Sequence, residues 1–149
     1  MRKIILILMF MLAASAAQAI EYTWENDAGK MVKASSLEGK SVVFHFWASW
    51  CPPCRKEMPA LVKWIAKHPE VQTVVLSLDR SRSSAEDFFK AKGIQMPINI
   101  GNMSQTSSLG VRGLPSTFIV NAKGEIVKRF TGDVDWDNPA KSKEVMSWL

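Results

Sequence analysis

Residues 43–61 have the sequence VFHFWASWCPPCRKEMPAL. Apolar and aromatic residues extend to Trp50, Cys51 and Cys54 follow with two prolines between them, and the last residues place apolar side chains at helical spacing. A strand, a tight turn and a helix are therefore predicted in succession. This arrangement puts Cys51 at a helix N-terminus, where unpaired N–H groups and the helix dipole favour a thiolate and make the thiol reactive.

The first nineteen residues have the layout of an export signal. Two basic residues precede an apolar run at 4–14, and the tripeptide AQA ends at Ala19. We therefore predict a signal peptide at 1–19, cleaved after Ala19, and one domain at 20–149 that functions in the periplasm or another extracytoplasmic compartment. The apolar run is short for a membrane span, and an uncleaved N-terminal membrane anchor is the alternative.

Length and composition indicate a single globular domain. The chain has 149 residues, of which 47% are apolar and 22% are charged, and this is enough to build a core without disulfide staples. The formal net charge of +5 is not gathered in a basic tract, so nucleic acid is not an expected partner. A monomer without a cofactor is expected.

The spacing of the two cysteines favours a redox pair over a structural bridge. A disulfide between Cys51 and Cys54 closes so short a loop that it restricts the unfolded chain very little. Zinc sites share the spacing, so a metal-binding module with His45 or His68 as a further ligand is an alternative, although such sites usually combine two ligand pairs. A c-type haem is excluded here because Arg55 stands where the CxxCH motif requires histidine.

The other patterns predict alternating strands and helices. A β-hairpin is expected around residues 26–29, buried strands are expected at 41–47 and 71–78, and the helix after Cys51 should end at His68-Pro69. Further elements are expected as a helix ending at Gly93, a short strand at 96–100, a short helix at 104–109, a hairpin of strands at 116–120 and 125–130, and a final helix from Pro139. This order predicts an α/β fold with a mixed central sheet and helices on both faces.

Three separated motifs resemble the thioredoxin-like superfamily. They are FWASWCPPC at 46–54, GVRGLP at 110–115 and STFIVNAKGEIVKRFTG at 116–132. Within the superfamily, WCPPCRKEMP and an added helix and strand at about 83–100 are similar to exported thiol–disulfide oxidoreductases of the TlpA/ResA/CcmG type. The resemblance implies a thioredoxin-like sheet flanked by helices, with an N-terminal β-hairpin and a helix/strand insertion. The segment between the strand at 71–78 and Gly110 is too short for the large helical insertion of the DsbA branch.

This resemblance implies disulfide exchange with protein substrates through a redox-active pair. Cys51 is expected to attack, and Cys54, one helical turn later and more buried, is expected to resolve the mixed disulfide. By resemblance, Pro115 forms a cis-proline loop that offers the Leu114 backbone to an extended substrate. Trp50 is expected to shape the apolar surface around the pair.

Pro52 and Pro53 bear on the direction of electron flow, and both are expected to contribute to substrate binding. Neither proline can donate an N–H group, so backbone donation to the Cys51 thiolate depends largely on Cys54. Fewer donors stabilise the thiolate less, which predicts a less oxidising couple and hence a reductase. The resemblance adds a membrane-bound thiol electron donor, and cytochrome c maturation or a related periplasmic pathway as the setting.

Two ionisable side chains have more than one interpretation. Glu57 matches a glutamate that this branch carries beside its active site, so it is a candidate to tune Cys54 or to relay its proton, and a solvated helix glutamate is the alternative. His45 stands where thioredoxins usually carry a buried acid. It is a candidate base, and a hydrogen-bonded structural histidine is the alternative.

Three functions compete with a reductase. A disulfide-forming oxidant would use the same cysteines at a more positive potential. A thiol peroxidase would require a PxxxTxxC setting for its peroxidatic cysteine, which the sequence lacks. The metal-binding module described above is the third.

Overall fold

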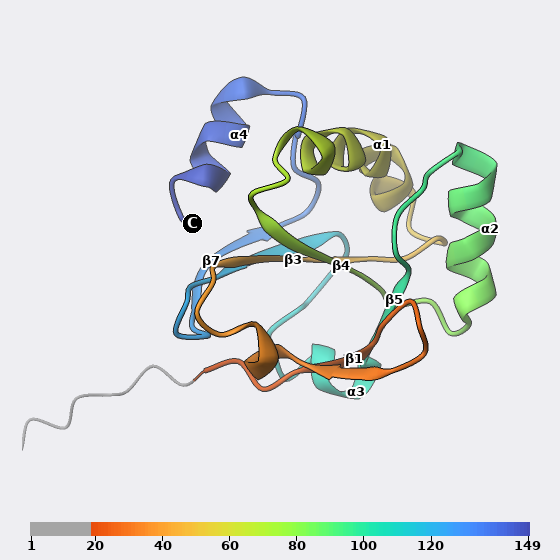
Figure 1. Cartoon of the computed structure of the whole chain (residues 1–149). Coiled ribbons are helices and arrows are strands. Elements are labelled where there is room, and N and C mark those ends of the chain that lie inside the picture. The colour runs from red at the N-terminus through yellow and green to blue at the C-terminus, as the bar shows by residue number, and fades with distance from the viewer. Residues whose placement is uncertain (1–18) are drawn as a thin grey trace, which may run out of the picture.

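The computed structural model describes residues 19–149 (Figure 1). The signal peptide predicted at 1–19 therefore lies outside the described residues, except for Ala19 itself. Within the described range, no helix has the length and apolar character needed to cross a membrane.

A mixed sheet of seven strands organises the described residues. The strands follow one another across the sheet in the order β2 (Met31–Lys33), β1 (Thr23–Glu25), β5 (Asn99–Gly101), β4 (Gln72–Ser77), β3 (Val42–Trp47), β6 (Ser116–Val120) and β7 (Ile126–Thr131). The neighbours β3, β4 and β5 run parallel, whereas the other pairs are antiparallel. The mixed α/β sheet expected from the sequence is confirmed.

The helices cover the two faces of the sheet unequally. The longer helices α1 (Pro52–Lys67), α2 (Arg82–Lys92) and α4 (Pro139–Met146) contribute to one core, on one side of the sheet (Figure 1). The short elements η1 (Ala34–Leu37) and α3 (Met103–Thr106) lie on the other side. There the N-terminal residues Ile20, Tyr22 and Trp24 add buried apolar cover of their own.

The central strand β3 is buried along its whole length. Its side chains alternate between the two cores, because successive residues of a strand point to opposite faces. Val43 and Trp47 belong to the core under α1, and Phe44 and Phe46 belong to the core on the opposite face. Burial on both faces explains the nearly continuous apolar sequence of this strand.

The N-terminal hairpin joins the main sheet, which the sequence patterns did not predict. Strand β1 pairs with β5 through Trp24 opposite Gly101 and Glu25 opposite Ile100. The short strand lies at Asn99–Gly101, slightly later than the predicted 96–100. A Cβ atom at Gly101 would lie 2.7 Å from the Tyr22 hydroxyl, so any larger residue there would have to displace the buried Tyr22 side chain.

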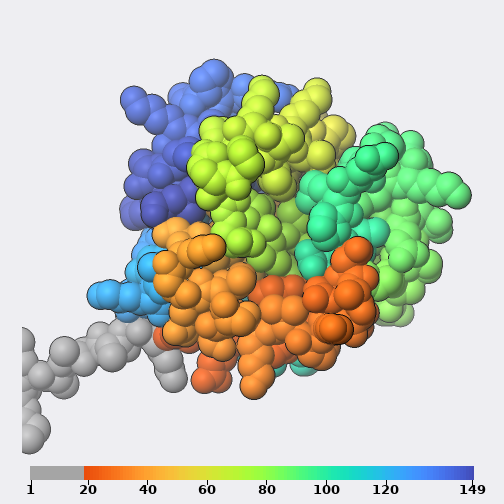
Figure 2. Space-filling model, in the orientation of Figure 1, coloured from red at the N-terminus to blue at the C-terminus, as the bar shows by residue number. Residues whose placement is uncertain are grey.

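Arg82, at the start of α2, connects this helix to the hairpin and to the segment before β5. Its guanidinium donates hydrogen bonds to Glu25 Oε1 at 2.7 Å, to the Asn26 carbonyl at 2.8 Å and to the Ile98 carbonyl at 2.7 Å. Figure 2 shows the N-terminal segment (orange) lying against α2 (green) at the surface. One partly buried side chain therefore ties together three segments that are distant in sequence.

We predict that Arg82→Met lowers the free energy of unfolding by about 1–3 kcal/mol, because the methionine retains an apolar stem but donates no hydrogen bond. Urea unfolding followed by circular dichroism measures the change. Arg80→Met is the matched control, since Arg80 is exposed and removal of its charge should have little effect. Equal stability of the two variants would contradict the connecting role of Arg82.

Candidate active site

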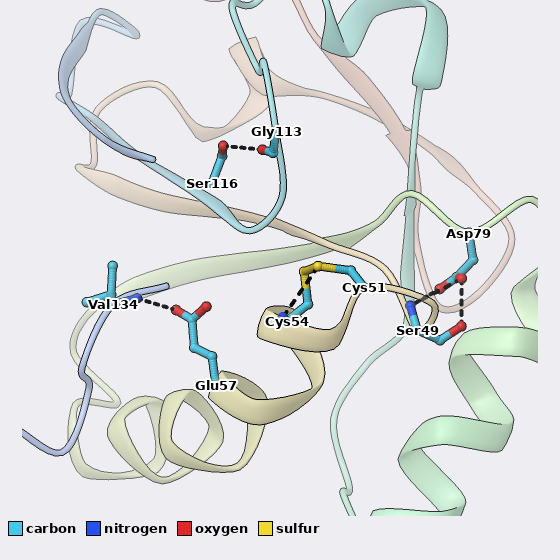
Figure 3. Close-up of a disulfide and its surroundings, with 8 residues drawn as sticks. All are labelled: Ser49, Cys51, Cys54, Glu57, Asp79, Gly113, Ser116 and Val134. Atoms are coloured by element: carbon cyan, nitrogen blue, oxygen red, sulfur yellow. Dashed lines mark hydrogen bonds between the residues drawn. A yellow bond between two sulfur atoms is a disulfide. The ribbon is translucent and has the colours of Figure 1, made fainter. Parts of the chain in front are cut away.

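The two cysteines lie where β3 gives way to α1. Cys51 is the N-cap residue of α1, and Pro52 and Pro53 occupy its first turn, where a missing N–H group costs no helical hydrogen bond. Cys51 and Cys54 are joined by a disulfide, with their Cα atoms 5.3 Å apart (Figure 3). The exposed fraction is 4% for Cys51 and 0% for Cys54, so any entering thiol approaches from the Cys51 side.

The Cys51 sulfur accepts few hydrogen bonds from backbone N–H groups. The Cys54 N–H donates to Cys51 Sγ at a distance of 3.4 Å. Among the described residues this is the one hydrogen bond to that sulfur, since Pro52 and Pro53 have no N–H to offer. The local geometry is thus the one expected from the CPPC sequence.

An acidic residue anchors the turn that leads to Cys51. The Asp79 carboxylate accepts hydrogen bonds from the Ser49 N–H at 3.0 Å and from the Ser49 hydroxyl at 2.7 Å (Figure 3). It also accepts one from the Ser77 hydroxyl at 2.7 Å. Asp79 follows β4, the parallel neighbour of β3, so the carboxylate and the turn meet at the same edge of the sheet. The sequence patterns did not predict this contact, although an acidic residue directly after a buried strand is a signal for it.

The loop before β6 ends at the same edge. The Leu114–Pro115 peptide bond is cis, and the Ser116 hydroxyl donates to the Gly113 carbonyl at 2.6 Å (Figure 3). Ser116 pairs with Phe46 near the end of β3, which brings this loop to the part of the sheet from which the Cys51 turn emerges. The loop that contains Leu114 therefore ends at the same edge of the sheet as the redox turn.

The two tryptophans before Cys51 have opposite environments. Trp47 is buried in the core, where its ring stacks on Phe89 with centroids 5.2 Å apart. Trp50 is 64% exposed, next to Cys51 in the chain. An exposed aromatic side chain beside a reactive thiol offers an apolar contact to an incoming protein.

Glu57 is buried one helical turn after Cys54, with an exposed fraction of 5%. Its Oε1 accepts a hydrogen bond from the Val134 N–H at 3.2 Å and another from the Trp136 indole N–H. Burial raises the pKa of Glu57 to about 7, although both hydrogen bonds act in the opposite direction, and the negative charge of Asp133 adds to the rise. The side chain is therefore not the solvated helix glutamate considered as an alternative.

His45 is completely buried on β3. Its Nδ1 lies 2.9 Å from the Thr117 hydroxyl, and its Nε2 has no hydrogen-bond partner among the described residues. Burial lowers the pKa of His45 to about 3, because the charged imidazolium is excluded from water. A histidine that stays neutral at pH 7 and has so low a pKa is a poor proton acceptor, which favours the structural interpretation.

The second histidine lies away from the cysteines. His68 is the C-cap residue of α1, at the opposite end of the helix from Cys51, and its Nδ1 lies 3.1 Å from Glu70 Oε1. Across residues 19–149, no group of three histidine, cysteine or acidic side chains is placed to hold a metal ion. The structure thus does not bring together the ligands that the metal-binding alternative requires.

Replacement of Glu57 by glutamine should change how stability depends on pH. The folded protein keeps a proton on Glu57 that the unfolded chain releases above about pH 4.5. The contribution of Glu57 to the free energy of unfolding is therefore fully present below that pH and is lost as the pH rises to about 7. Relative to Glu57→Gln, the loss is roughly 3 kcal/mol. Urea unfolding of both oxidised proteins across this range measures it, and a constant difference between them would contradict the raised pKa.

Comparisons with known proteins agree with this geometry. The Redoxin family model matches residues 12–146. Thiol-disulfide oxidoreductase ResA of Halalkalibacterium halodurans is 33% identical over 124 residues, which are 81% of this chain and 70% of that protein. ResA of Bacillus subtilis is 31% identical over 122 residues, which are 80% of this chain and 68% of that protein.

Solved structures give the same result. The crystal structure of StoA from Bacillus subtilis has a TM-score of 0.68 and 27% identity, and the match covers 89% of this chain and 98% of that one. A protein from Chlorobium tepidum assigned as thiol:disulfide interchange protein DsbE has a TM-score of 0.74 and 26% identity, with 88% and 94% covered. With its disulfide at the start of α1, the chain therefore belongs to the Redoxin family, as a thioredoxin-fold thiol–disulfide oxidoreductase of the ResA type.

Proposed function

We propose that the protein is an extracytoplasmic protein-disulfide reductase that exchanges disulfides with protein substrates through Cys51 and Cys54. The observation that carries this proposal is the sparse donation to Cys51 Sγ, which accepts one backbone hydrogen bond from Cys54. A thiolate with few donors is less stabilised, and a dithiol whose thiolate is less stabilised is a better reductant. The signal-like sequence of residues 1–19 supports the compartment.

The reaction proceeds by two exchanges. The Cys51 thiolate attacks a substrate disulfide, so that a mixed disulfide forms and one substrate sulfur leaves as a thiolate. Cys54 then attacks Cys51 Sγ, the Cys51–Cys54 disulfide forms, and the second substrate sulfur leaves with its electron pair. The proton of Cys54 passes to the Glu57 carboxylate, whose pKa of about 7 suits proton exchange near neutral pH.

Substrate binding uses the surface around the exposed side of Cys51. The backbone of Leu114, which precedes Pro115 in the loop before β6, binds an extended substrate segment by adding it as a strand. Trp50, with Pro52 and Pro53, supplies apolar contact on the other side of the sulfur. The substrate is therefore a locally unfolded protein with an accessible disulfide, of which apocytochrome c is one class.

The oxidised pair must be reduced again in each cycle. A membrane-bound dithiol electron donor attacks the disulfide at Cys51, the more exposed sulfur position, and Cys54 leaves as a thiolate that regains a proton from Glu57. The second thiol of the donor then attacks the mixed disulfide, so that the donor becomes a disulfide and Cys51 leaves as a thiolate. Cys51, Cys54 and Glu57 thus perform the same exchange in the opposite direction. A monomer suffices for both exchanges, because all of these residues belong to the same chain.

Trapping of mixed disulfides tests this function. We predict that Cys54→Ser accumulates covalent adducts with extracytoplasmic proteins, because Cys51 still attacks and nothing resolves the product. Non-reducing electrophoresis reveals the adducts, and dithiothreitol releases them for mass spectrometry. Cys51→Ser is the matched control and should form none. Equal yields of adduct from the two variants would contradict the assignment of Cys51 as nucleophile.

A further inference from the structure

The segment DVDWDN at 133–138 supplies both hydrogen-bond donors that Glu57 receives. The Val134 N–H and the Trp136 indole N–H converge on Glu57 Oε1 from positions 77 and 79 residues away in the sequence. Val134 and Trp136 are buried, whereas the aspartates that alternate with them are exposed. Exposed and buried side chains therefore alternate along this segment. The buried side chains and the donor groups face Glu57 of α1.

The two oxygens of the Glu57 carboxyl group differ in environment. Oε1 accepts both hydrogen bonds, and Oε2 is buried with no partner among residues 19–149. Cys54 and Glu57 are three residues apart on α1 and so share a helix face. In Figure 3, the oxygen that is not bonded to Val134 points to the side on which Cys54 lies. The oxygen left free for a proton is thus the one turned toward the resolving cysteine.

Trp136 is itself held in place from two elements. Its ring packs against Trp64 of α1, with centroids 4.9 Å apart, and stands edge-on to His45 of β3, with centroids 6.3 Å apart. This packing sets the direction in which the indole N–H points. It also gives buried His45 a part in the site, as support for the aromatic ring that holds Glu57.

We propose that Trp136 is a positioning residue of the redox site, whose indole N–H fixes one oxygen of Glu57 so that the other exchanges a proton with Cys54. The inference rests on the role of Glu57 in the proposed function. In the resolving step, Oε2 takes the proton of the Cys54 thiol while Cys54 Sγ bonds to Cys51 Sγ and the substrate sulfur leaves as a thiolate. Trp136 takes no part in the bond changes of this step and acts only through its hydrogen bond to Glu57.

Removal of the indole donor has a predictable electrostatic consequence. The hydrogen bond from Trp136 favours the carboxylate, so its loss raises the pKa of Glu57 further above its ordinary range. The other ionisable groups near the carboxyl are Asp133 with its neighbouring aspartates, neutral His45 on β3, and the cysteine pair on α1 itself. Replacement of Trp136 removes none of these groups, although it changes the ring that His45 packs against.

The test is the pH profile of the resolving step in Trp136→Phe. The reduced protein is mixed with oxidised glutathione, samples are quenched with acid, and mass spectrometry separates the glutathione adduct on Cys51 from the final disulfide. In the wild type, the rate at which the adduct resolves should rise with an inflection near pH 7, where Glu57 becomes a carboxylate. In Trp136→Phe the inflection should move up by about 1 pH unit, and resolution at pH 7 should slow about fivefold.

Trp64→Phe is the matched control. Trp64 belongs to the same aromatic cluster, but its indole N–H donates to the Ser142 hydroxyl at 2.7 Å and not to Glu57. This variant should keep the wild-type inflection. If Trp64→Phe and Trp136→Phe shift the inflection equally, the effect is general loosening of the cluster and the proposal is wrong.

Site-specific replacement of Trp136 by benzothienylalanine provides a second test in case the phenylalanine variant does not fold. It exchanges the N–H for sulfur and keeps the shape of the ring, so the shift should persist. An unshifted inflection in this folded variant contradicts the proposal.

Glu57→Gln separates this inference from the proposed function. Glutamine accepts no proton at neutral pH, so the inflection near pH 7 should disappear. If Glu57→Gln leaves the profile unchanged, the role of Glu57 fails and the positioning role fails with it. If Glu57→Gln removes the inflection but the Trp136 variants do not move it, Glu57 keeps its role and the positioning role alone is contradicted.

Discussion

Burial of β3 on both faces of the sheet is the constraint on which the site depends. Because β3 is paired on both sides and alternates its side chains between two cores, a shift by one residue would exchange the contents of the cores. Its end is therefore fixed, and with it the turn through Ser49 to Cys51. The Asp79 carboxylate ties that turn to β4, and the prolines after Cys51 start α1 at once. These contacts place the Cys51 sulfur at the edge of the sheet where the cis-proline loop also ends.

The protein also keeps the carboxyl group of Glu57 and the imidazole of His45 out of water. Both become neutral under conditions in which exposed side chains would be charged, because the low polarity of the core penalises their ions. The consequences differ. Glu57 gains a pKa close to neutral pH and so becomes able to exchange a proton, whereas the pKa of His45 falls far below neutral and leaves a ring that serves packing.

The sequence predicted the parts of this site that are local or belong to recognisable motifs. The buried strand, the cysteines at the start of a helix and the final strand pairing each depend on patterns within a few residues. The contact between Glu57 and Trp136 joins residues 79 positions apart, and a tryptophan between aspartates resembles an ordinary loop. The pairing of β1 with β5 and the Asp79–Ser49 hydrogen bonds were missed for the same reason, since they form only when the whole chain is folded. His45 was ambiguous because its residue type fits both a base and a core side chain, and its burial distinguishes them.

We propose that the Cys51–Cys54 pair is a reductant because the Cys51 sulfur accepts only one backbone hydrogen bond among the described residues. The midpoint potential of the Cys51–Cys54 couple tests it most directly, by equilibration of the protein in dithiothreitol and glutathione buffers and measurement of the reduced fraction with a thiol-reactive mass label. We predict a potential well below the roughly −120 mV of DsbA, in the direction of the roughly −270 mV of thioredoxin. A potential as positive as that of DsbA would contradict a reducing role, because it would require a thiolate stabilised far beyond what the single N–H donor of Cys54 provides.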